Sequence, residues 1–234
     1  MIRFASGVTM TNAATDLVVG LVLIPLTIAI KRINAQDEYE KKLWVKFMSV
    51  LTAVCLTGFI AHGFVWNETA YGFLWVGLYA IMFVAVRNFF FVAAHKHTNG
   101  EGIGKKLSII IDAVSFALYI LLSVMSLKHI NPIRIFVIYG FFIVIPAFVL
   151  FGILVHREED KASKLVLAAF LPQIVGGIYM LCRIPEFKFI VPLDHNCIYH
   201  LCLLVSVVIF YYAARKSLLG EYREESEEQE ETCV

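Results

Sequence analysis

Charged residues are scarce in this chain. They make up 17% of its 234 residues, while 59% are apolar, and the mean hydropathy is +0.76. No CxxC pair, phosphate-binding glycine loop or GxSxG motif is present, which excludes the commonest signatures of soluble enzymes. The composition lies outside the soluble range and predicts an all-α membrane protein, for which no nucleic-acid partner is expected.

We also expect no cleaved signal peptide at the start of this sequence. The charged start at Arg3 is followed by polar Thr9, Thr11 and Asn12, with no compact apolar core and no small-residue cleavage site. We therefore expect the first apolar run to insert into the bilayer and to stay in the protein.

Long apolar runs dominate the rest of the chain. A helix needs roughly 20 residues to cross the hydrocarbon core of a bilayer, and several runs reach that length. They cover approximately residues 12–30, 44–66, 71–94, 108–126, 133–155, 164–184 and 194–214. The sequence thus predicts a seven-transmembrane-helix bundle over residues 1–216 and a polar tail over residues 217–234.

The distribution of Lys and Arg predicts the orientation of this bundle. Thirteen of these residues fall in segments that are inside if the N-terminus is outside, and five fall in segments on the other face. Cytoplasmic segments are enriched in Lys and Arg. We therefore expect an outside N-terminus and a cytoplasmic C-terminus.

The tail has a composition typical of disorder. From Gly220 onward it contains seven glutamates and almost no apolar residues, so it cannot bury enough surface to fold. Its last residues, Thr232, Cys233 and Val234, match the C-terminal pattern that PDZ grooves accept by strand addition. A solubilising cytoplasmic tail without such a partner is the alternative.

Cysteines are few, and their placement leaves two alternatives open. Cys182 and Cys197 both fall near the predicted outer ends of the last two spans. A disulfide between them is one alternative, and free thiols packed as small apolar side chains are the other.

Polar residues inside the spans gather at one predicted depth. An ionisable side chain in lipid is costly enough that its presence suggests a function. With the predicted orientation, polar groups of four spans fall in the outer third of the membrane: Asn12 and Asp16, His62, Tyr179 and Arg183, and Asp194, His195, Asn196, Tyr199 and His200. We interpret this coincidence as a candidate site.

Other polar residues near the predicted inner side have structural interpretations. Arg87 and Asp112 are expected to form an ordinary ion pair between two helices. His95 and His97 are expected to lie in a solvated loop without a functional role.

The residue types of the candidate site are those of a catalytic metal centre. Imidazole and carboxylate are ligands of catalytic zinc, which keeps one position open for a water molecule that it activates. We expect zinc ligands among His62, His195, His200 and Asp16. On a regular helix His195 and His200 point about 140° apart, so His195 would have to lie in an unwound first turn after Pro192. Asp194 is expected to cap that helix.

These features resemble the CREST superfamily of membrane hydrolases, which includes alkaline ceramidases and progestin/adiponectin-type receptors. The resemblance rests on seven spans, a histidine near the end of the second span and a histidine cluster that opens the seventh. It implies that His62 and His200 bind zinc, as the second-span ligand and the second histidine of a seventh-span HxxxH motif.

The chain departs from that family at three positions. Gly58 stands where the family has a serine, although Thr57 is adjacent, and Asn196 holds the first position of the HxxxH motif. The family's aspartate at the start of the third span has no counterpart, which leaves Asp16 as its expected substitute.

The sequence therefore predicts a zinc-dependent hydrolase that cleaves an amide or ester bond of a lipid-like substrate. Asp16 would act as general base, and Arg183 or Tyr179 would stabilise the oxyanion. The alternative is a non-catalytic receptor or small-solute transporter whose outer pocket uses Asp16, Arg183, Asp194 and the histidines. A third alternative is hydrogen bonding between helices without further function. A retinal protein is excluded because residues 195–214 contain no lysine.

Overall fold

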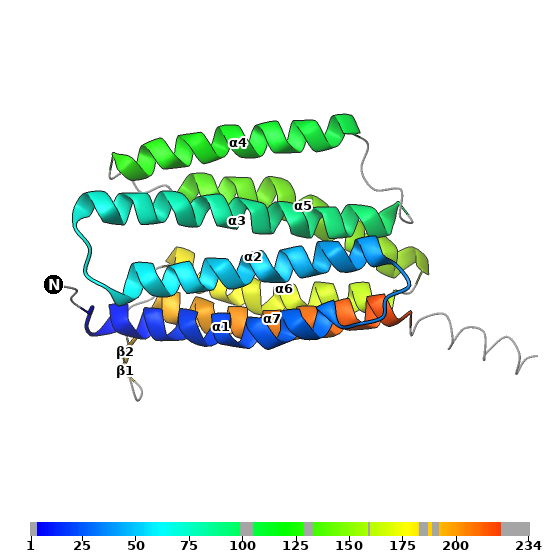
Figure 1. Ribbon diagram of the computed structural model, residues 1–234, viewed down its shortest axis with the longest axis horizontal. Helices are drawn as coiled ribbons and strands as arrows, with labels where there is room; N and C mark the ends of the chain where they lie inside the picture. Colours follow the sequence, from blue (N-terminus) through cyan, green and yellow to red (C-terminus); the bar gives the residue numbers. More distant parts are fainter. Residues whose placement is uncertain are drawn as a thin grey trace, which may run out of the picture.

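The computed structural model describes residues 4–98, 105–128, 133–158, 160–182, 187–188 and 192–220. Helices of alternating direction fill most of this part of the chain (Figure 1). They are α1 (Val8–Lys31), α2 (Glu38–Gly63), α3 (Glu68–His97), α4 (Lys105–Leu127), α5 (Ile133–Glu158), α6 (Lys161–Cys182) and α7 (His195–Leu219). The tail beyond Gly220, with Thr232, Cys233 and Val234, lies outside the described residues.

The helices have the length and composition of membrane spans. Within the described residues, six are long and apolar enough to cross a membrane, and α5 adds the shorter apolar stretch Val144–Arg157. At the helical rise, the 24 residues of α1 extend about 36 Å, more than the hydrocarbon thickness of about 30 Å. The chain is thus an all-α membrane protein by the length and composition of its helices.

The helix ends follow from local capping more than from hydropathy. Asp37 caps α2 by accepting hydrogen bonds from the backbone N–H groups of Tyr39 and Glu40, so this helix begins before its apolar run. It ends at Gly63, because Phe64 is already extended, whereas the apolar run predicts an end at residue 66.

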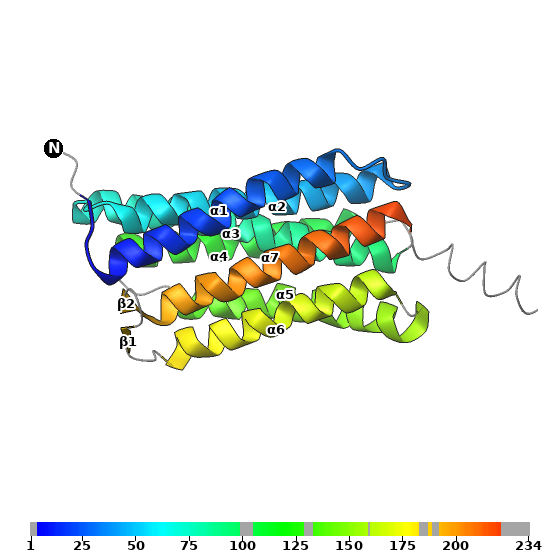
Figure 2. The same cartoon turned by 90° about the horizontal axis from the view of Figure 1, so that it is seen from below.

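A short hairpin precedes α7 and was not predicted from the sequence. Strands β1 (Phe187–Lys188) and β2 (Pro192–Leu193) pair in antiparallel fashion. Figures 1 and 2 show the hairpin at the end of the bundle where α1 and α7 begin. Two-residue strands give no alternating pattern that sequence reading can detect.

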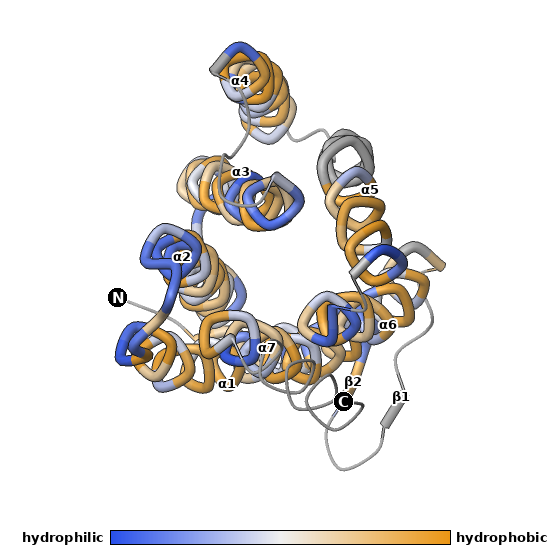
Figure 3. Tube along the Cα trace, turned by 90° about the vertical axis from the view of Figure 1, so that its right-hand side faces the viewer, coloured by the Kyte–Doolittle hydropathy of each residue, from blue (hydrophilic) through white to orange (hydrophobic). Residues whose placement is uncertain are grey.

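The packing brings the first and last helices together. α1 packs between α2 and α7, α7 packs on α6, and α3 packs on α2, α4 and α5. Seen along the bundle, α4 stands at the edge (Figure 3), where it contacts α3 and α5 among the described elements. Polar residues of α1, α2 and α7 can therefore meet although they are far apart in sequence.

Five phenylalanines form an aromatic layer across the bundle. Phe89 of α3 has its ring centroid 5.3 Å from Phe47, 5.6 Å from Phe151, 5.4 Å from Phe170 and 5.6 Å from Phe210, each from a different helix. Such spacings are those of favourable aromatic pairs. The layer joins five helices and fills the bundle interior with apolar rings.

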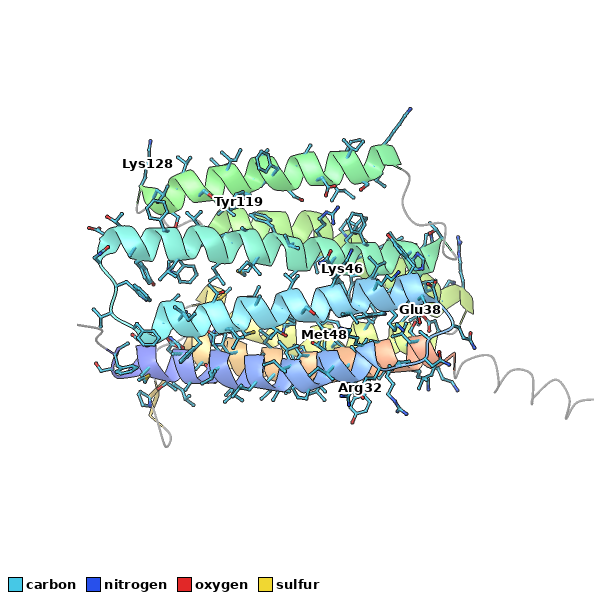
Figure 4. All side chains as sticks on the ribbon, in the orientation of Figure 1. Arg32, Glu38, Lys46, Met48, Tyr119 and Lys128 are labelled. Atoms are coloured by element: carbon cyan, nitrogen blue, oxygen red, sulfur yellow. The ribbon has the colours of Figure 1, made fainter. Side chains whose placement is uncertain are left out.

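A buried polar network closes the end of the bundle where α1 finishes, the end marked by Arg32 and Glu38 in Figure 4, opposite Lys128. We call it the lysine network: Glu40, Trp44, Lys96, Asp160, Ser163 and Ser217. Lys96 Nζ donates to Ser217 Oγ at 2.5 Å and lies 3.3 Å from Asp160 Oδ2. Ser217 Oγ donates to Glu40 Oε1 at 2.6 Å. The network joins α2, α3, α6 and α7.

His95 corrects a sequence-based expectation. It lies within α3, which extends to His97, and it is buried with Nε2 2.7 Å from Asp37 Oδ2. Partial burial of the Asp37 carboxyl opposes ionisation, but hydrogen bonds from Glu40 N–H and from His95 outweigh it and hold the pKa of Asp37 below its usual value. His95 is therefore a structural partner of the α2 cap and does not lie in a solvated loop.

The predicted pair of Arg87 and Asp112 is confirmed. The guanidinium of Arg87 on α3 binds both carboxylate oxygens of Asp112 on α4, with Nη2 2.9 Å from Oδ2. Its Cζ atom also lies 4.1 Å from the ring centroid of Phe91. This bidentate contact fastens the edge helix α4 to the rest of the bundle.

Replacing Lys96 by methionine should destabilise the protein strongly. The change leaves the buried carboxylates of Glu40 and Asp160 without their cation, which costs about 3 kcal/mol. Thermal unfolding in detergent measures the effect. The exposed Lys42 at the same end of α2 provides the control, since Lys42→Met should change stability by less than about 0.5 kcal/mol. Equal midpoints for the two variants would contradict the assigned role of the network.

Candidate functional site

The carboxylate of Asp16 lies at the meeting point of three helices. Asp16 is on α1, two turns from its start, and is only 5% exposed. Its Oδ1 atom is 3.3 Å from Nε2 of His200 on α7, and its other oxygen faces Gly58 on α2. The predicted convergence of Asp16 with a seventh-span histidine is confirmed.

Gly58 makes room for this carboxylate. A Cβ atom built at position 58 would lie 2.5 Å from Asp16 Oδ2 and 2.9 Å from its Cγ, closer than real contacts allow. The missing side chain lets α2 approach α1 with Asp16 between them. In this chain the carboxylate thus occupies the space that a side chain at position 58 would need.

The ring of His200 is held by a neighbour of Asp16. Its Nδ1 atom is 2.9 Å from Thr15 Oγ1, and Thr15 Oγ1 donates its proton to the carbonyl oxygen of Asn12 at 2.8 Å. A hydroxyl has one proton, and the Asn12 carbonyl, the Thr11 carbonyl and His200 Nδ1 all lie within hydrogen-bond distance of the Thr15 oxygen. When Thr15 donates to its own backbone, its oxygen accepts from His200, and the proton of a neutral His200 ring lies on Nδ1.

The tautomer of His200 decides what its other ring nitrogen presents to Asp16. In a neutral His200 protonated at Nδ1, Nε2 presents a lone pair to the Asp16 carboxylate. Two electron-rich atoms repel one another unless a proton or a cation lies between them. The observed 3.3 Å is longer than the roughly 2.7–2.9 Å of a charge-assisted N–H···O hydrogen bond.

His62 approaches the pair from α2. Its ring centroid is 6.4 Å from that of His200, and it makes an edge contact with Trp75 of α3 at 5.7 Å. The second-span and seventh-span histidines thus face the same region, as the sequence predicted, without direct contact between their polar atoms among the described interactions.

The rim of the site joins α1 to the start of α7. Asn12 Nδ2 donates to Asp194 Oδ2 at 3.3 Å, and Cys197 Sγ donates to Asn12 Oδ1 at 2.8 Å. Asp194 also caps α7 by accepting from the N–H groups of Asn196 and Cys197, which confirms its predicted role. We call the whole set the histidine cluster: Asn12, Thr15, Asp16, His62, Asp194, Cys197 and His200.

The disulfide considered from the sequence is not formed. Cys182 is an exposed free thiol, and Cys197 is a buried free thiol bonded to Asn12. The alternative of packed free thiols is the correct one for Cys197.

Three predicted site residues make no described hydrogen bond or ring contact with the cluster. His195 begins α7 within the regular helix, five residues and about 140° from His200, so the unwound turn proposed for it is absent. Tyr179 is half-buried on α6. Arg183 lies outside the described residues.

Sequence reasoning missed three residues at the site: Thr15, Trp75 and Cys197, the last of which was considered only for a disulfide. Thr15 was overlooked because a threonine in a helix usually bonds its own backbone, which it also does here. Trp75 was overlooked because aromatic residues are common in any membrane bundle. The polar run from Thr11 to Asp16 was the available signal for Thr15.

Comparison with known protein families gives one result. Residues 11–219 match a family described as a family of unknown function, DUF6962. The chain belongs to that family. Comparison with curated proteins found no match. The matched range contains the whole histidine cluster and the lysine network, whereas most of the acidic tail lies beyond it.

The spacing of Asp16 and His200 fits two ligands of one zinc ion, whereas the spacing of His62 and His200 does not. Two ligands on a tetrahedral zinc, each about 2.0–2.1 Å from the ion, lie roughly 3.3 Å apart, as Asp16 Oδ1 and His200 Nε2 do. Two histidines on one zinc have ring centroids on the order of 5 Å apart, shorter than the 6.4 Å between His62 and His200. Accordingly, no group of three His, Cys, Asp or Glu side chains within the described residues is placed to hold a metal ion.

Gly58→Ala should disturb the site through Asp16. The added methyl group displaces the carboxylate, and the expected cost is about 1–3 kcal/mol. Thermal unfolding in detergent measures it. Gly77→Ala is the matched control, because nothing lies within 4 Å of a Cβ at that helical position.

A double variant tests the cause of the Gly58→Ala effect. With Asp16→Ala in place, the clash is gone, so adding Gly58→Ala should cost little. Additive losses of stability would show that Gly58 acts through other neighbours.

Proposed function

We propose that this DUF6962 protein is a zinc-dependent membrane hydrolase that cleaves an amide or ester bond in a lipid-like substrate. The observation that carries the proposal is the 3.3 Å between His200 Nε2 and Asp16 Oδ1, two groups that lie buried inside the bundle. A shared cation satisfies both groups, and a nitrogen and an oxygen ligand are those that zinc takes. His62, whose ring centroid is 6.4 Å from that of His200, is the third ligand of this proposal and has to move toward the ion to bind it.

The chain's own groups have distinct roles in the proposed reaction. Thr15 holds the His200 ring so that Nε2 faces Asp16, as ligand-orienting partners do in metal sites. Zinc bound there would supply a water molecule activated for attack on a carbonyl carbon. Asp16 would take the proton that the attacking water loses and return it to the amine or alcohol that leaves when the carbonyl C–N or C–O bond breaks. Tyr179 and Arg183 remain the candidates for stabilising the oxyanion.

A lipid-like substrate follows from the surroundings of the site. Asp16 and His200 are buried within helices whose outward faces are apolar, for example Val18, Leu21 and Leu201. A substrate that is itself dissolved in the bilayer can reach such residues from the side. Water-soluble substrates would first have to leave water.

The alternative of a solute transporter receives less support. The aromatic layer around Phe89 lies between the histidine cluster and the lysine network. To cross the bundle, a polar solute would have to pass between the five aromatic rings and also break the contacts of Lys96. A hydrolase needs only a path by which its substrate reaches the histidine cluster, and no path through the bundle.

Metal content tests the proposed site. Protein purified without added chelator should contain about one zinc per chain by elemental analysis. Asp16→Asn and His200→Ala should each lower zinc affinity at least tenfold, because each removes a ligand, and His62→Ala should do the same if its ring closes on the ion. His97→Ala, at the far end of α3, is the control and should keep its zinc. Absence of transition metal, or unchanged zinc in Asp16→Asn and His200→Ala, would end the proposal.

Hydrolysis itself separates the enzyme from the receptor alternative. Mixed detergent micelles that contain long-chain amides and esters should release free fatty acid, detected by mass spectrometry, without any gradient. Asp16→Asn should reduce the rate at least a hundredfold, since it removes the proton acceptor. Zinc binding without any release of fatty acid would favour a non-catalytic receptor.

We also infer seven membrane crossings with the N-terminus outside and the C-terminus in the cytoplasm. The alternating helices and the excess of Lys and Arg at the lysine-network end support this orientation. It puts the histidine cluster in the outer part of the membrane.

Cys182 provides the test of orientation. It is exposed and lies at the end of the bundle where α1 begins, while Cys55 and Cys197 are buried. In a Cys233→Ser background, a membrane-impermeant maleimide should label intact cells, and Cys182→Ser should abolish the labelling. Labelling only after permeabilisation would reverse the inferred orientation.

A further inference from the structure

The indole N–H of Trp75 is an unused hydrogen-bond donor beside the histidine cluster. Its Nε1 atom is sealed from solvent and has no hydrogen-bond partner among the described residues. Buried donors are nearly always paired, so an unpaired one requires an explanation. An indole nitrogen can donate but cannot accept or bind a metal, which means that the missing partner is an acceptor.

The indole N–H groups of the other two tryptophans both have hydrogen-bond acceptors. Trp44 Nε1 donates to Glu40 Oε1 at 3.0 Å, and Trp66 Nε1 donates to the carbonyl oxygen of Ile60 at 3.1 Å. The chain therefore satisfies the indole N–H at two of its three tryptophans and leaves the third, next to the candidate site, without a partner.

The position of Trp75 links it to the site. Its ring meets that of His62 at 5.7 Å and nearly perpendicular, at 79°, and His62 faces His200 on its other side. Tyr71 and Tyr79, one turn to either side on α3, have ring centroids 5.9 Å and 5.7 Å from Trp75. The unpaired donor thus belongs to an aromatic wall that α3 adds to the histidine cluster.

The charges nearby restrict the class of acceptor. The histidine cluster contains two carboxylates, those of Asp16 and Asp194. It includes no lysine or arginine among the described residues. Without a bound cation, an anionic ligand would be repelled by these carboxylates in a medium of low dielectric constant. A neutral carbonyl oxygen accepts a hydrogen bond without that cost.

We propose that Trp75 Nε1 donates a hydrogen bond to the carbonyl oxygen of a neutral acyl-chain ligand, an amide or ester, bound between α3 and the histidine cluster. The inference rests on the proposed function, because the carbonyl that accepts this hydrogen bond would be the one whose carbon is attacked. The aromatic wall of Tyr71 and Trp75 contacts the apolar part of the ligand. Trp75 is thereby the residue that distinguishes an acyl carbonyl from a plain hydrocarbon.

Nuclear magnetic resonance of the indole N–H groups tests this directly. The ¹⁵N-labelled full chain in detergent should give three indole signals, and Trp75→Phe assigns one of them. Dodecanamide should move the Trp75 proton signal to higher frequency, as a new hydrogen bond requires, and dodecane at the same concentration should not. The signals of Trp44 and Trp66 are already hydrogen-bonded and should stay in place, which also reports that the fold is intact.

The phenylalanine variant gives a second readout. Trp75→Phe keeps an aromatic ring and loses only the donor and part of the ring area, so the affinity for dodecanamide should fall roughly fivefold, in line with the loss of one hydrogen bond. Unchanged Trp44 and Trp66 signals in this variant exclude unfolding as the cause.

Three results would overturn the inference: no shift of the Trp75 signal with dodecanamide, an equal shift with dodecane, or a Trp75 signal that is already at the hydrogen-bonded position without ligand. The outcome is separable from the zinc test. A carbonyl-specific shift in a protein without zinc keeps the ligand site and removes the hydrolase. Bound zinc with no shift keeps the hydrolase proposal and removes the role of Trp75.

Discussion

The carboxylate of Asp16 is the constraint on which this end of the bundle depends. A charged or strongly polar group inside a membrane bundle must find partners on other helices, because lipid offers none. Asp16 finds His200 on α7 and a space on α2 that exists only because residue 58 is glycine. These contacts fix how α1, α2 and α7 are rotated and how closely they approach.

The other polar groups follow from this arrangement. With α1 and α7 in place, Thr15 orients the His200 ring, and Asn12 joins the cap of α7 at Asp194. At the opposite end, Lys96 performs a comparable function by joining α2, α3, α6 and α7. Between the two polar regions lies the aromatic layer around Phe89, which explains how one bundle can hold both regions without a continuous polar path.

Much of the fold was predictable because membrane helices can be recognised as long apolar runs in the sequence. The helical segments, the cap at Asp194 and the pair of Arg87 with Asp112 follow from local patterns. The burial of His95 does not, because hydropathy alone ends that helix before the histidine, and its partner Asp37 lies in a different part of the chain. His195 was expected to reach the site only from an unwound first turn, whereas α7 is regular from His195 onward and brings His200 to Asp16.

The sequence by itself determined that the chain is a helical membrane protein and which helices carry ionisable groups at the same depth. It did so because apolar length and residue order are enough to place a residue along a span. Only the tertiary structure decided which of those groups meet, that Gly58 admits Asp16, and that Trp75 keeps an unpaired N–H. These outcomes depend on the rotation of each helix about its axis, which is set by packing between segments far apart in the chain.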